Sequence, residues 1–83
     1  MHDVVLPKLG MGTTEADIVE RYVDVGEFVP LGGALVEVET EKVTTDIEAD
    51  AAGVLAEWCV AEGDVAAVGS VICRIDTTRG PPS

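Results

Sequence analysis

Lys42 is the first side chain whose position in the sequence suggests chemistry. It lies in the stretch VEVETEKVTTDIEA, residues 36–49, where it is the only positive charge among five negative ones. The only other lysine in the chain is Lys8. On position and charge alone, the simpler interpretation is that Lys42 offsets the neighbouring carboxylates. An exposed ion pair of that kind contributes about 0–1 kcal/mol to stability.

The remaining reactive side chains do not form a catalytic or metal-binding pattern. Cys59 and Cys73 have neither the CxxC spacing nor any other metal-ligand spacing, and His2 stands at the N-terminus. We therefore expect two buried thiols that act as small hydrophobic side chains, and a reducing compartment. There is no nucleophile–base pairing and no glycine loop before a helix, so we expect no active site.

The charge balance narrows the classes of partner. Sixteen acidic and five basic residues give a formal net charge of −11. This excludes ordinary nucleic-acid binding, which requires a cationic surface, and it disfavours docking on anionic lipid. Such charge provides solubility or attracts a basic partner. No stretch is apolar enough to span a bilayer, and MHDVVLPKLG lacks a signal-peptide layout, so we expect no membrane association and a cytoplasmic protein.

The elements that must position Lys42 are predicted to be β-strands. Short runs such as DIVERYV, ALVEVET, KVTTDIEA and SVICRID are rich in β-branched residues and end at Gly, Pro, Asp or Thr. In KVTTDIEA the residues alternate, so that one predicted face holds Val43, Thr45, Ile47 and Ala49 and the other holds Thr44, Asp46 and Glu48. No window has a helical period of useful length. We predict an all-β domain in which Glu41 and Lys42 form the tip of a β-hairpin.

The chain also repeats itself at an offset of thirty-seven residues, so that residues 18–40 align with residues 55–77. Both copies share the frame G-[ED]-x-[VA]-x-x-G-x-x-[LI]-x-x-[VI]-[ED]. Two such halves should pack with approximate two-fold symmetry. The counterpart of the lysine hairpin is then the gap between the last strand and the first. We predict that Val4 or Val5 pairs with a residue near Arg74 to Asp76, with both termini at the pole opposite Lys42.

The combined motif and repeat resemble the lipoyl domain of the dihydrolipoyl acyltransferase component of 2-oxo acid dehydrogenase complexes. The resemblance covers residues 3–76, and its most specific part is VETEKVTTDIEADAAGVL. It implies a flattened barrel or sandwich of two four-stranded antiparallel sheets related by a pseudo-two-fold axis. Residues 1–76 would be the lipoyl carrier domain. The segment TTRGPPS, residues 77–83, would begin a flexible linker or form a disordered tail.

The resemblance also implies roles for individual residues. The lysine that matches Lys42 carries lipoic acid in amide linkage, with Glu41 and Val43 flanking it for recognition by the ligase. Glu41 stands where aspartate is common in the family, and Gly33 stands where an acidic residue is frequent. By resemblance, the first surface loop helps partner enzymes recognise the domain, and this makes Lys8 a poor candidate for modification. The loop consists of Lys8, Leu9, Gly10, Met11, Gly12, Thr13 and Thr14.

The function implied by the resemblance is carriage of acyl groups and reducing equivalents without an active site in the domain. The implied partners are a lipoate ligase or lipoyl transferase, a thiamine-diphosphate-dependent 2-oxo acid decarboxylase, an acyltransferase catalytic domain and dihydrolipoyl dehydrogenase. The isolated domain is expected to be monomeric. It would be cytoplasmic in a bacterium and in the mitochondrial matrix of a eukaryote. The 2-oxo acid stays open among pyruvate, 2-oxoglutarate, branched-chain and acetoin-type substrates.

Three alternatives to this interpretation were compared with the sequence. A biotin carrier domain has a similar fold and also uses a hairpin lysine, but it typically flanks that lysine with methionines, whereas Met1 and Met11 are distant in this sequence. The glycine-cleavage H protein carries lipoate as well, but it is larger. A lipoyl-like structural or adaptor domain would leave Lys42 unmodified.

Overall fold

The computed structural model describes residues 1–81, which form eight β-strands and no helix. Residues 82 and 83, the end of the predicted tail, lie outside the described residues. The described chain accordingly contains no helix that could cross a membrane. The strands are β1 (His2–Val5), β2 (Glu15–Arg21), β3 (Phe28–Val29), β4 (Ala34–Glu39), β5 (Thr44–Glu48), β6 (Gly53–Trp58), β7 (Val65–Ala67) and β8 (Val71–Asp76).

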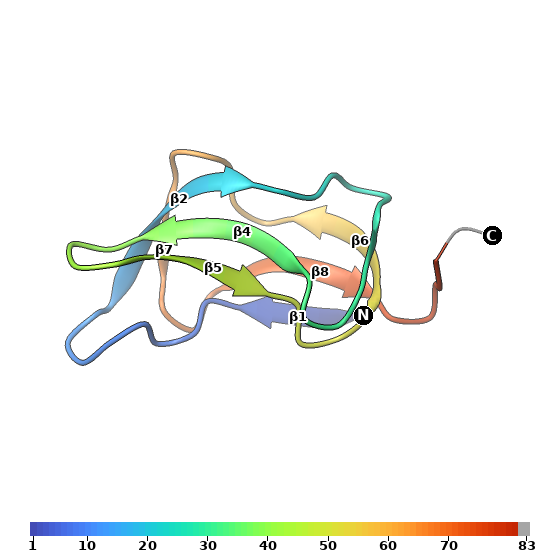
Figure 1. Cartoon of the computed structure of the whole chain (residues 1–83), viewed down its shortest axis with the longest axis horizontal. Helices are drawn as coiled ribbons and strands as arrows, with labels where there is room; N and C mark the ends of the chain where they lie inside the picture. The colour runs from blue at the N-terminus through green and yellow to red at the C-terminus, as the bar shows by residue number, and fades with distance from the viewer. Residues whose placement is uncertain (82–83) are drawn as a thin grey trace.

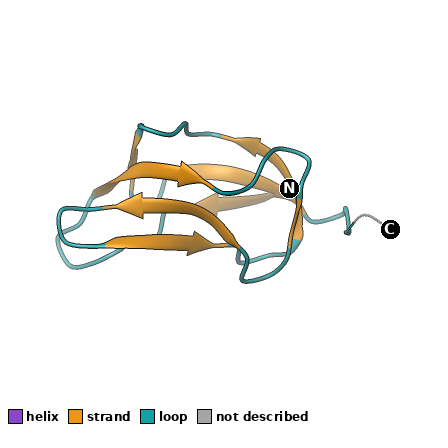
Figure 2. Ribbon diagram, turned by 45° about the horizontal axis from the view of Figure 1, so that its top comes forward, coloured by secondary structure: helices purple, strands orange, loops and turns teal. Residues whose placement is uncertain are grey.

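The strands form two four-stranded sheets, in the orders β1-β8-β6-β3 and β5-β4-β2-β7. Every pairing is antiparallel. The two sheets face each other as the layers of an elongated sandwich, which the ribbon views show from two angles (Figures 1 and 2). The predicted all-β fold of two four-stranded antiparallel sheets is confirmed, in its sandwich form.

The internal repeat of the sequence corresponds to an internal repeat of the structure. A shift of thirty-seven residues superimposes the range of β4 on that of β8. The β2–β4 pair and the β6–β8 pair contain bulges at equivalent positions. Loop hydrogen bonds repeat as well: the amide of Gly26 donates to the carbonyl of Leu55 at 2.8 Å, and the amide of Gly63 donates to the carbonyl of Ile18 at 2.8 Å. Because each half donates to the other in the same way, the two halves are related by the predicted pseudo-two-fold axis.

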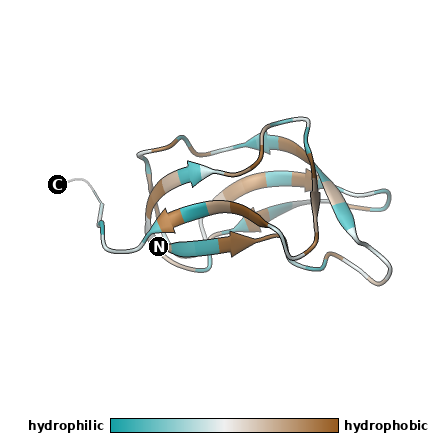
Figure 3. Ribbon diagram, turned by 180° about the vertical axis from the view of Figure 1, so that it is seen from behind, coloured by the Kyte–Doolittle hydropathy of each residue, from teal (hydrophilic) through white to brown (hydrophobic). Residues whose placement is uncertain are grey.

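The core lies between the two sheets and is almost entirely aliphatic. Its buried residues come from the strands of both sheets. Apolar and polar segments follow one another along the ribbon (Figure 3). On the face predicted for residues 43–49, Ile47 and Ala49 are buried and Thr45 is half-buried. Val43 is exposed, because it lies in the hairpin loop beyond the last strand pair. The cysteines differ from the expectation of two buried thiols, because Cys73 is buried while Cys59 is exposed. Cys59 directly follows β6, on the outer side of the sheet that contains Cys73, so the cysteines do not form a disulfide.

Gly53, the first residue of β6, occupies a position that requires a glycine. A Cβ atom at this position would overlap the backbone carbonyl of Asp76 and the side chain of Ile75 on β8. The φ angle of Gly53 is not positive, so its role is close approach of two strands and not an unusual backbone conformation.

The two termini and the Lys42 hairpin lie at opposite ends of the molecule, which extends 42 Å along its long axis (Figure 1). The predicted pairing of the first and last strands is confirmed, because β1 pairs with β8 near Arg74. Val4 pairs with Cys73, and it is Asp3 that pairs with Arg74. A bulge between Val4 and Val5 shifts the register, and the sequence pattern did not reveal it.

Candidate functional site

Strands β4 and β5 position Lys42 at the tip of a tight hairpin. The last strand pair is Glu39 with Thr44, and the amide of Thr40 donates to the carbonyl of Val43 at 2.7 Å. Glu41 and Lys42 are therefore the two residues of the connecting loop, as the sequence predicted. Lys42, Glu41 and Val43 are all exposed.

Thr40 fixes the backbone of this loop, and the sequence analysis did not identify it. Two-residue hairpin loops usually need residues with positive φ, yet neither Glu41 nor Lys42 has one. Instead, the Thr40 hydroxyl oxygen accepts the amides of Lys42 at 3.3 Å and of Val43 at 3.2 Å. A threonine directly after a strand and before a short polar loop is the pattern that could have indicated this role.

The Lys42 side chain stands in an acidic environment but has no ion-pair partner among the residues that the structure describes. Within residues 1–81, the basic side chains that contact a carboxylate at ion-pair distance are His2 and Arg74. The absence of a partner argues against the simple role of offsetting a carboxylate. The amine is thus free to react with another molecule, and the hairpin holds it away from the body of the domain.

The end of the first surface loop lies beside the lysine hairpin. Residues 11–17 and residues 39–42 together line an open cleft of about 510 Å³. Gly12, with a φ of 82°, turns the loop, and the amide of Thr13 donates to the carbonyl of Gly10 at 3.2 Å. Of the residues predicted to recognise partners, the structure brings Met11, Gly12, Thr13 and Thr14 to this cleft.

The beginning of the predicted recognition loop lies elsewhere. Lys8, Leu9 and Gly10 do not line the cleft. Leu9 is partly buried and packs against the hydrophobic core, so its position has a structural reason. Lys8 is exposed on the loop and is not part of a hairpin tip. Within residues 1–81, no cluster of His, Cys, Asp and Glu side chains has metal-ligating geometry.

A two-sheet sandwich with a lysine at a hairpin tip defines a class of covalent carrier domains, and comparison with known sequences agrees with this. The family model described as "Biotin-requiring enzyme", which covers biotinyl and lipoyl attachment domains, matches residues 2–75. The chain belongs to this biotin/lipoyl attachment family.

Among curated relatives, the chain is similar to two acyltransferase components. One is the dihydrolipoyllysine-residue succinyltransferase component of the 2-oxoglutarate dehydrogenase complex of Staphylococcus saprophyticus, 39% identical over 80 residues, covering 96% of this chain and 19% of the relative. The other is the dihydrolipoyllysine-residue acetyltransferase component of the pyruvate dehydrogenase complex of Corynebacterium glutamicum, 41% identical over 73 residues, covering 88% of this chain and 11% of the relative. The chain thus matches only a small part of these proteins.

A solved structure matches the chain over nearly the whole of both molecules. It is the solution structure of the lipoyl domain of the 2-oxoglutarate dehydrogenase complex from Azotobacter vinelandii, with a TM-score of 0.72 and 27% sequence identity. The match covers 89% of this chain and 94% of the other. The resemblance to lipoyl domains that the sequence indicated is therefore confirmed.

Proposed function

We propose that the protein is a lipoyl carrier domain, in which Lys42 bears lipoic acid through an amide bond. The observation that supports this most strongly is an unpaired lysine, fixed at a hairpin tip by Thr40, in a chain whose curated relatives are lipoyl-bearing acyltransferase components. The biotinyl alternative has less support, because Glu41 and Val43 flank the lysine in place of methionines.

The site suits the attachment reaction. The Lys42 amine forms an amide with the carboxyl carbon of an activated lipoyl group, the activating group leaves, and the amine loses its proton and its charge. An exposed hairpin tip allows the ligase to surround this amine. When bound, the dithiolane ring of lipoic acid supplies a disulfide that can be reductively acylated and later reoxidised. The residues around Lys42 contribute position, not catalysis.

The layout of the domain suits carriage between separate enzymes. The attachment lysine and the chain termini lie at opposite poles of a 42 Å molecule, so a tether at residues 77–81 leaves the surroundings of Lys42 free. The partners of this function are the lipoate ligase, the thiamine-diphosphate-dependent decarboxylase, the acyltransferase catalytic domain and dihydrolipoyl dehydrogenase. Within the first surface loop, residues 11–14 are better candidates for partner recognition than Lys8, Leu9 and Gly10, because residues 11–14 lie beside Lys42.

The experiment that tests this function is lipoylation by a lipoate ligase, followed by intact mass measurement and peptide mapping. We expect one lipoyl group, on Lys42, and no addition to Lys42→Gln. The Gln variant should keep the stability of the parent, since the side chain makes no contact that supports the fold. A biotinyl mass from a biotin ligase, no modification by either ligase, or a lipoyl group on Lys8 would contradict the proposal.

A matched control separates position from local composition. Exchanging the two loop residues, as Glu41→Lys with Lys42→Glu, preserves charge and composition but places the amine at the other loop position. The two positions of a two-residue loop aim their side chains differently. We therefore expect labelling to be nearly lost. Equal labelling of the exchanged and parent domains would show that the ligase reads the sequence and not the hairpin geometry.

A further inference from the structure

The loop that presents Lys42 is closed by one backbone hydrogen bond and one side-chain hydrogen bond. The residues on either side of a two-residue hairpin loop can exchange two backbone bonds. The amide of Thr40 donates to the carbonyl of Val43 at 2.7 Å, but within residues 1–81 the carbonyl of Thr40 does not accept the amide of Val43 in return. The Thr40 hydroxyl accepts that amide instead, at 3.2 Å. A side chain therefore replaces one of the two closing bonds.

The Thr40 hydroxyl uses its whole hydrogen-bonding capacity in this loop. It accepts the amides of Lys42 and Val43 at 3.3 and 3.2 Å, and it donates to the carbonyl of Val43 at 3.3 Å. A threonine hydroxyl has one donor and two acceptor lone pairs, so all three are engaged. Because the backbone of Lys42 determines where its side chain leaves the loop, the direction of that side chain depends on Thr40.

The lysine itself explains why the loop uses a side chain in this way. The two-residue turns that match the twist of the flanking strands have positive φ angles, which favour glycine and asparagine. Residues with long side chains rarely adopt such angles, and neither Glu41 nor Lys42 does. A loop with ordinary φ angles tends to splay its strands apart. The bonds to Thr40 oppose this by holding the far side of the loop against the end of β4.

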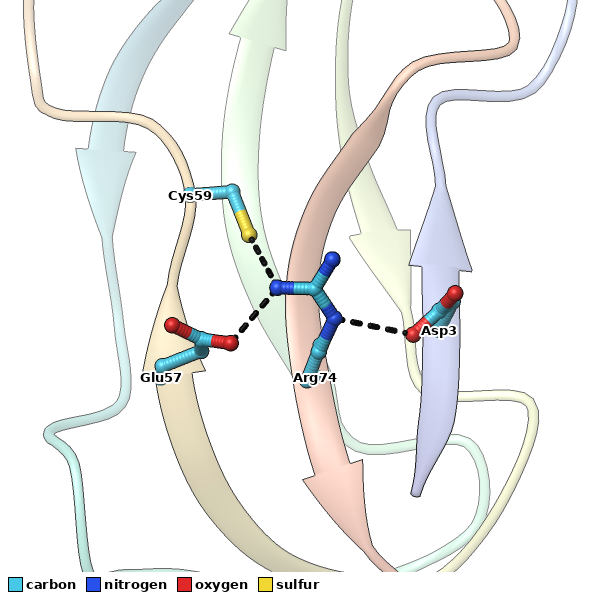
Figure 4. A network of polar contacts seen from close by, with 4 residues as sticks. All are labelled: Asp3, Glu57, Cys59 and Arg74. Atoms are coloured by element: carbon cyan, nitrogen blue, oxygen red, sulfur yellow. Dashed lines mark hydrogen bonds and ion pairs between the residues drawn. The ribbon is translucent and has the colours of Figure 1, made fainter.

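The internal repeat provides a comparison for the hairpin, because β4 and β8 correspond in pairing as well as in sequence. Glu37 of β4 and Arg74 of β8 each stand in the middle of a row of three paired residues. In the row of β8, Arg74 donates to Glu57 on one side and to Asp3 on the other, with its Nε 3.1 Å from Asp3 (Figure 4). Because the two strands align in this way, the residues that follow them can be compared directly.

The residue that follows each of these strands is a threonine, Thr40 after β4 and Thr77 after β8. Thr40 is half-buried and bound to the hairpin loop, whereas Thr77 is exposed. Within residues 1–81, the threonine that forms hydrogen bonds just after β8 is Thr78, which donates to Asp76, and not Thr77. Thr77 is thus the same residue at the equivalent place without a hairpin to support.

From these observations we propose that Thr40 is the positioning residue for the acylation of Lys42. The proposal rests on the lipoyl carrier function and names the residue that sets the rate of attachment. In that step the Lys42 nitrogen bonds to the carboxyl carbon of the activated lipoyl group, the bond to the activating group breaks with its electron pair, and the amine proton leaves to solvent. Thr40 touches none of these atoms and acts through the backbone of Lys42. Since orientation of a bound nucleophile strongly affects rate, the effect of Thr40 belongs to kcat and not to KM.

Three variants separate the hydroxyl from the rest of the side chain. Thr40→Val removes the hydroxyl and keeps the shape, Thr40→Ser keeps the hydroxyl, and Thr77→Val is the matched control. All three should unfold in urea like the parent, because water replaces the lost bonds of an exposed loop. We expect the amides of Lys42 and Val43 to exchange hydrogen about fivefold faster in Thr40→Val, as for the loss of one net hydrogen bond. Their exchange should not change in the other two variants.

Steady-state lipoylation by a lipoate ligase then measures the functional effect. We expect kcat to fall about fivefold to tenfold in Thr40→Val, with KM for the domain within about twofold of the parent value. Thr40→Ser and Thr77→Val should each keep kcat within about twofold. A small acylating reagent, the N-hydroxysuccinimide ester of acetate, approaches the amine from any direction. It should therefore modify Lys42 equally in all four domains, with Lys8 as the internal reference.

Several results would overturn the role of Thr40. These are a Thr40→Val domain with the kcat of the parent, an equal loss in Thr77→Val, or a Thr40→Ser domain as slow as Thr40→Val. A matching loss of reactivity towards the small reagent would also overturn it, because exposure of the amine and not its direction would then have changed. A parent domain that the ligase leaves unmodified would overturn the carrier function itself, and this result appears before any variant is compared.

Discussion

Replacing Glu37 by arginine should stabilise the free domain, because it would transfer the charge arrangement around Arg74 onto the equivalent row of the other sheet. In the parent domain, Glu37 stands opposite Glu20 on one side and Asp46 on the other. An arginine there would face two carboxylates, as Arg74 does between Glu57 and Asp3. The row would change from three negative charges to one positive charge between two negative ones.

The size of the effect follows from the two cross-strand pairs that change sign. Each such pair contributes roughly 0.2–1 kcal/mol, favourable for opposite charges and unfavourable for like charges. Because Glu37 is only half-buried, solvent screening places the total at about 1 kcal/mol. For a domain of this size that corresponds to an increase in Tm of about 4–8 °C.

Thermal and urea unfolding of Glu37→Arg, Glu37→Gln and the parent domain measure this effect. The glutamine variant removes the repulsion without adding attraction, so its Tm should lie between those of the other two. The order should persist in high salt, with smaller differences, since screening weakens exposed charge pairs. An arginine variant that is no more stable than the glutamine variant would refute the equivalence of the two rows.

Three further predictions concern the rest of the domain. Gly53→Ala should lower the free energy of unfolding by about 1–3 kcal/mol, as measured in urea, because a methyl group there overlaps the backbone of β8. Exposed Cys59 should react with a thiol reagent in the native state, whereas Cys73, whose pKa is raised to about 12 mainly by burial, should react only after unfolding. The hydroxyl of Tyr22 donates to Asp46 at 2.9 Å, which raises its pKa to about 12, so phenolate absorbance should titrate near that pH and closer to 10 in Asp46→Asn. Because the folded-state pKa is the higher one, this hydrogen bond stabilises the fold fully below about pH 10 and its contribution is lost as the pH rises towards 12.

The features of the fold that could be predicted are those that depend on periodicity. Alternating residues in KVTTDIEA placed Ile47 and Ala49 in the core, and the glycine frame located the pseudo-two-fold axis. From that axis, the pairing of the first and last strands and the position of the termini followed. The bulge between Val4 and Val5 was not predicted, because a bulge is a local backbone feature that leaves the alternation of neighbouring residues almost unchanged.

The parts of the site that could not be predicted depend on side-chain direction and on contacts distant in sequence. The residues around Lys42 in the sequence were enough to single out this lysine. The hydrogen bonds accepted by the Thr40 hydroxyl could not be predicted, because they depend on the conformation of the loop backbone. Cys59 was expected inside because the two cysteines lack CxxC or metal-ligand spacing, and a free cysteine is usually buried. It is exposed because β6 ends just before it. The loop at residues 8–14 was treated as one recognition unit, although Leu9 belongs to the core and only residues 11–14 reach the lysine cleft.

The pairing of β1 with β8 determines how the domain responds to mechanical load. Residues 2 and 76 both lie at the pole away from Lys42, so a pull applied between these two points would separate the strands from that end (Figure 1). In such an antiparallel pair the hydrogen bonds bear the force one after another, and the first pair to separate would be His2 with Ile75. The domain would therefore peel open at low force when stretched between its own ends. A pull on one end alone would instead drag the folded domain along, and the strands that present Lys42 would bear no tension.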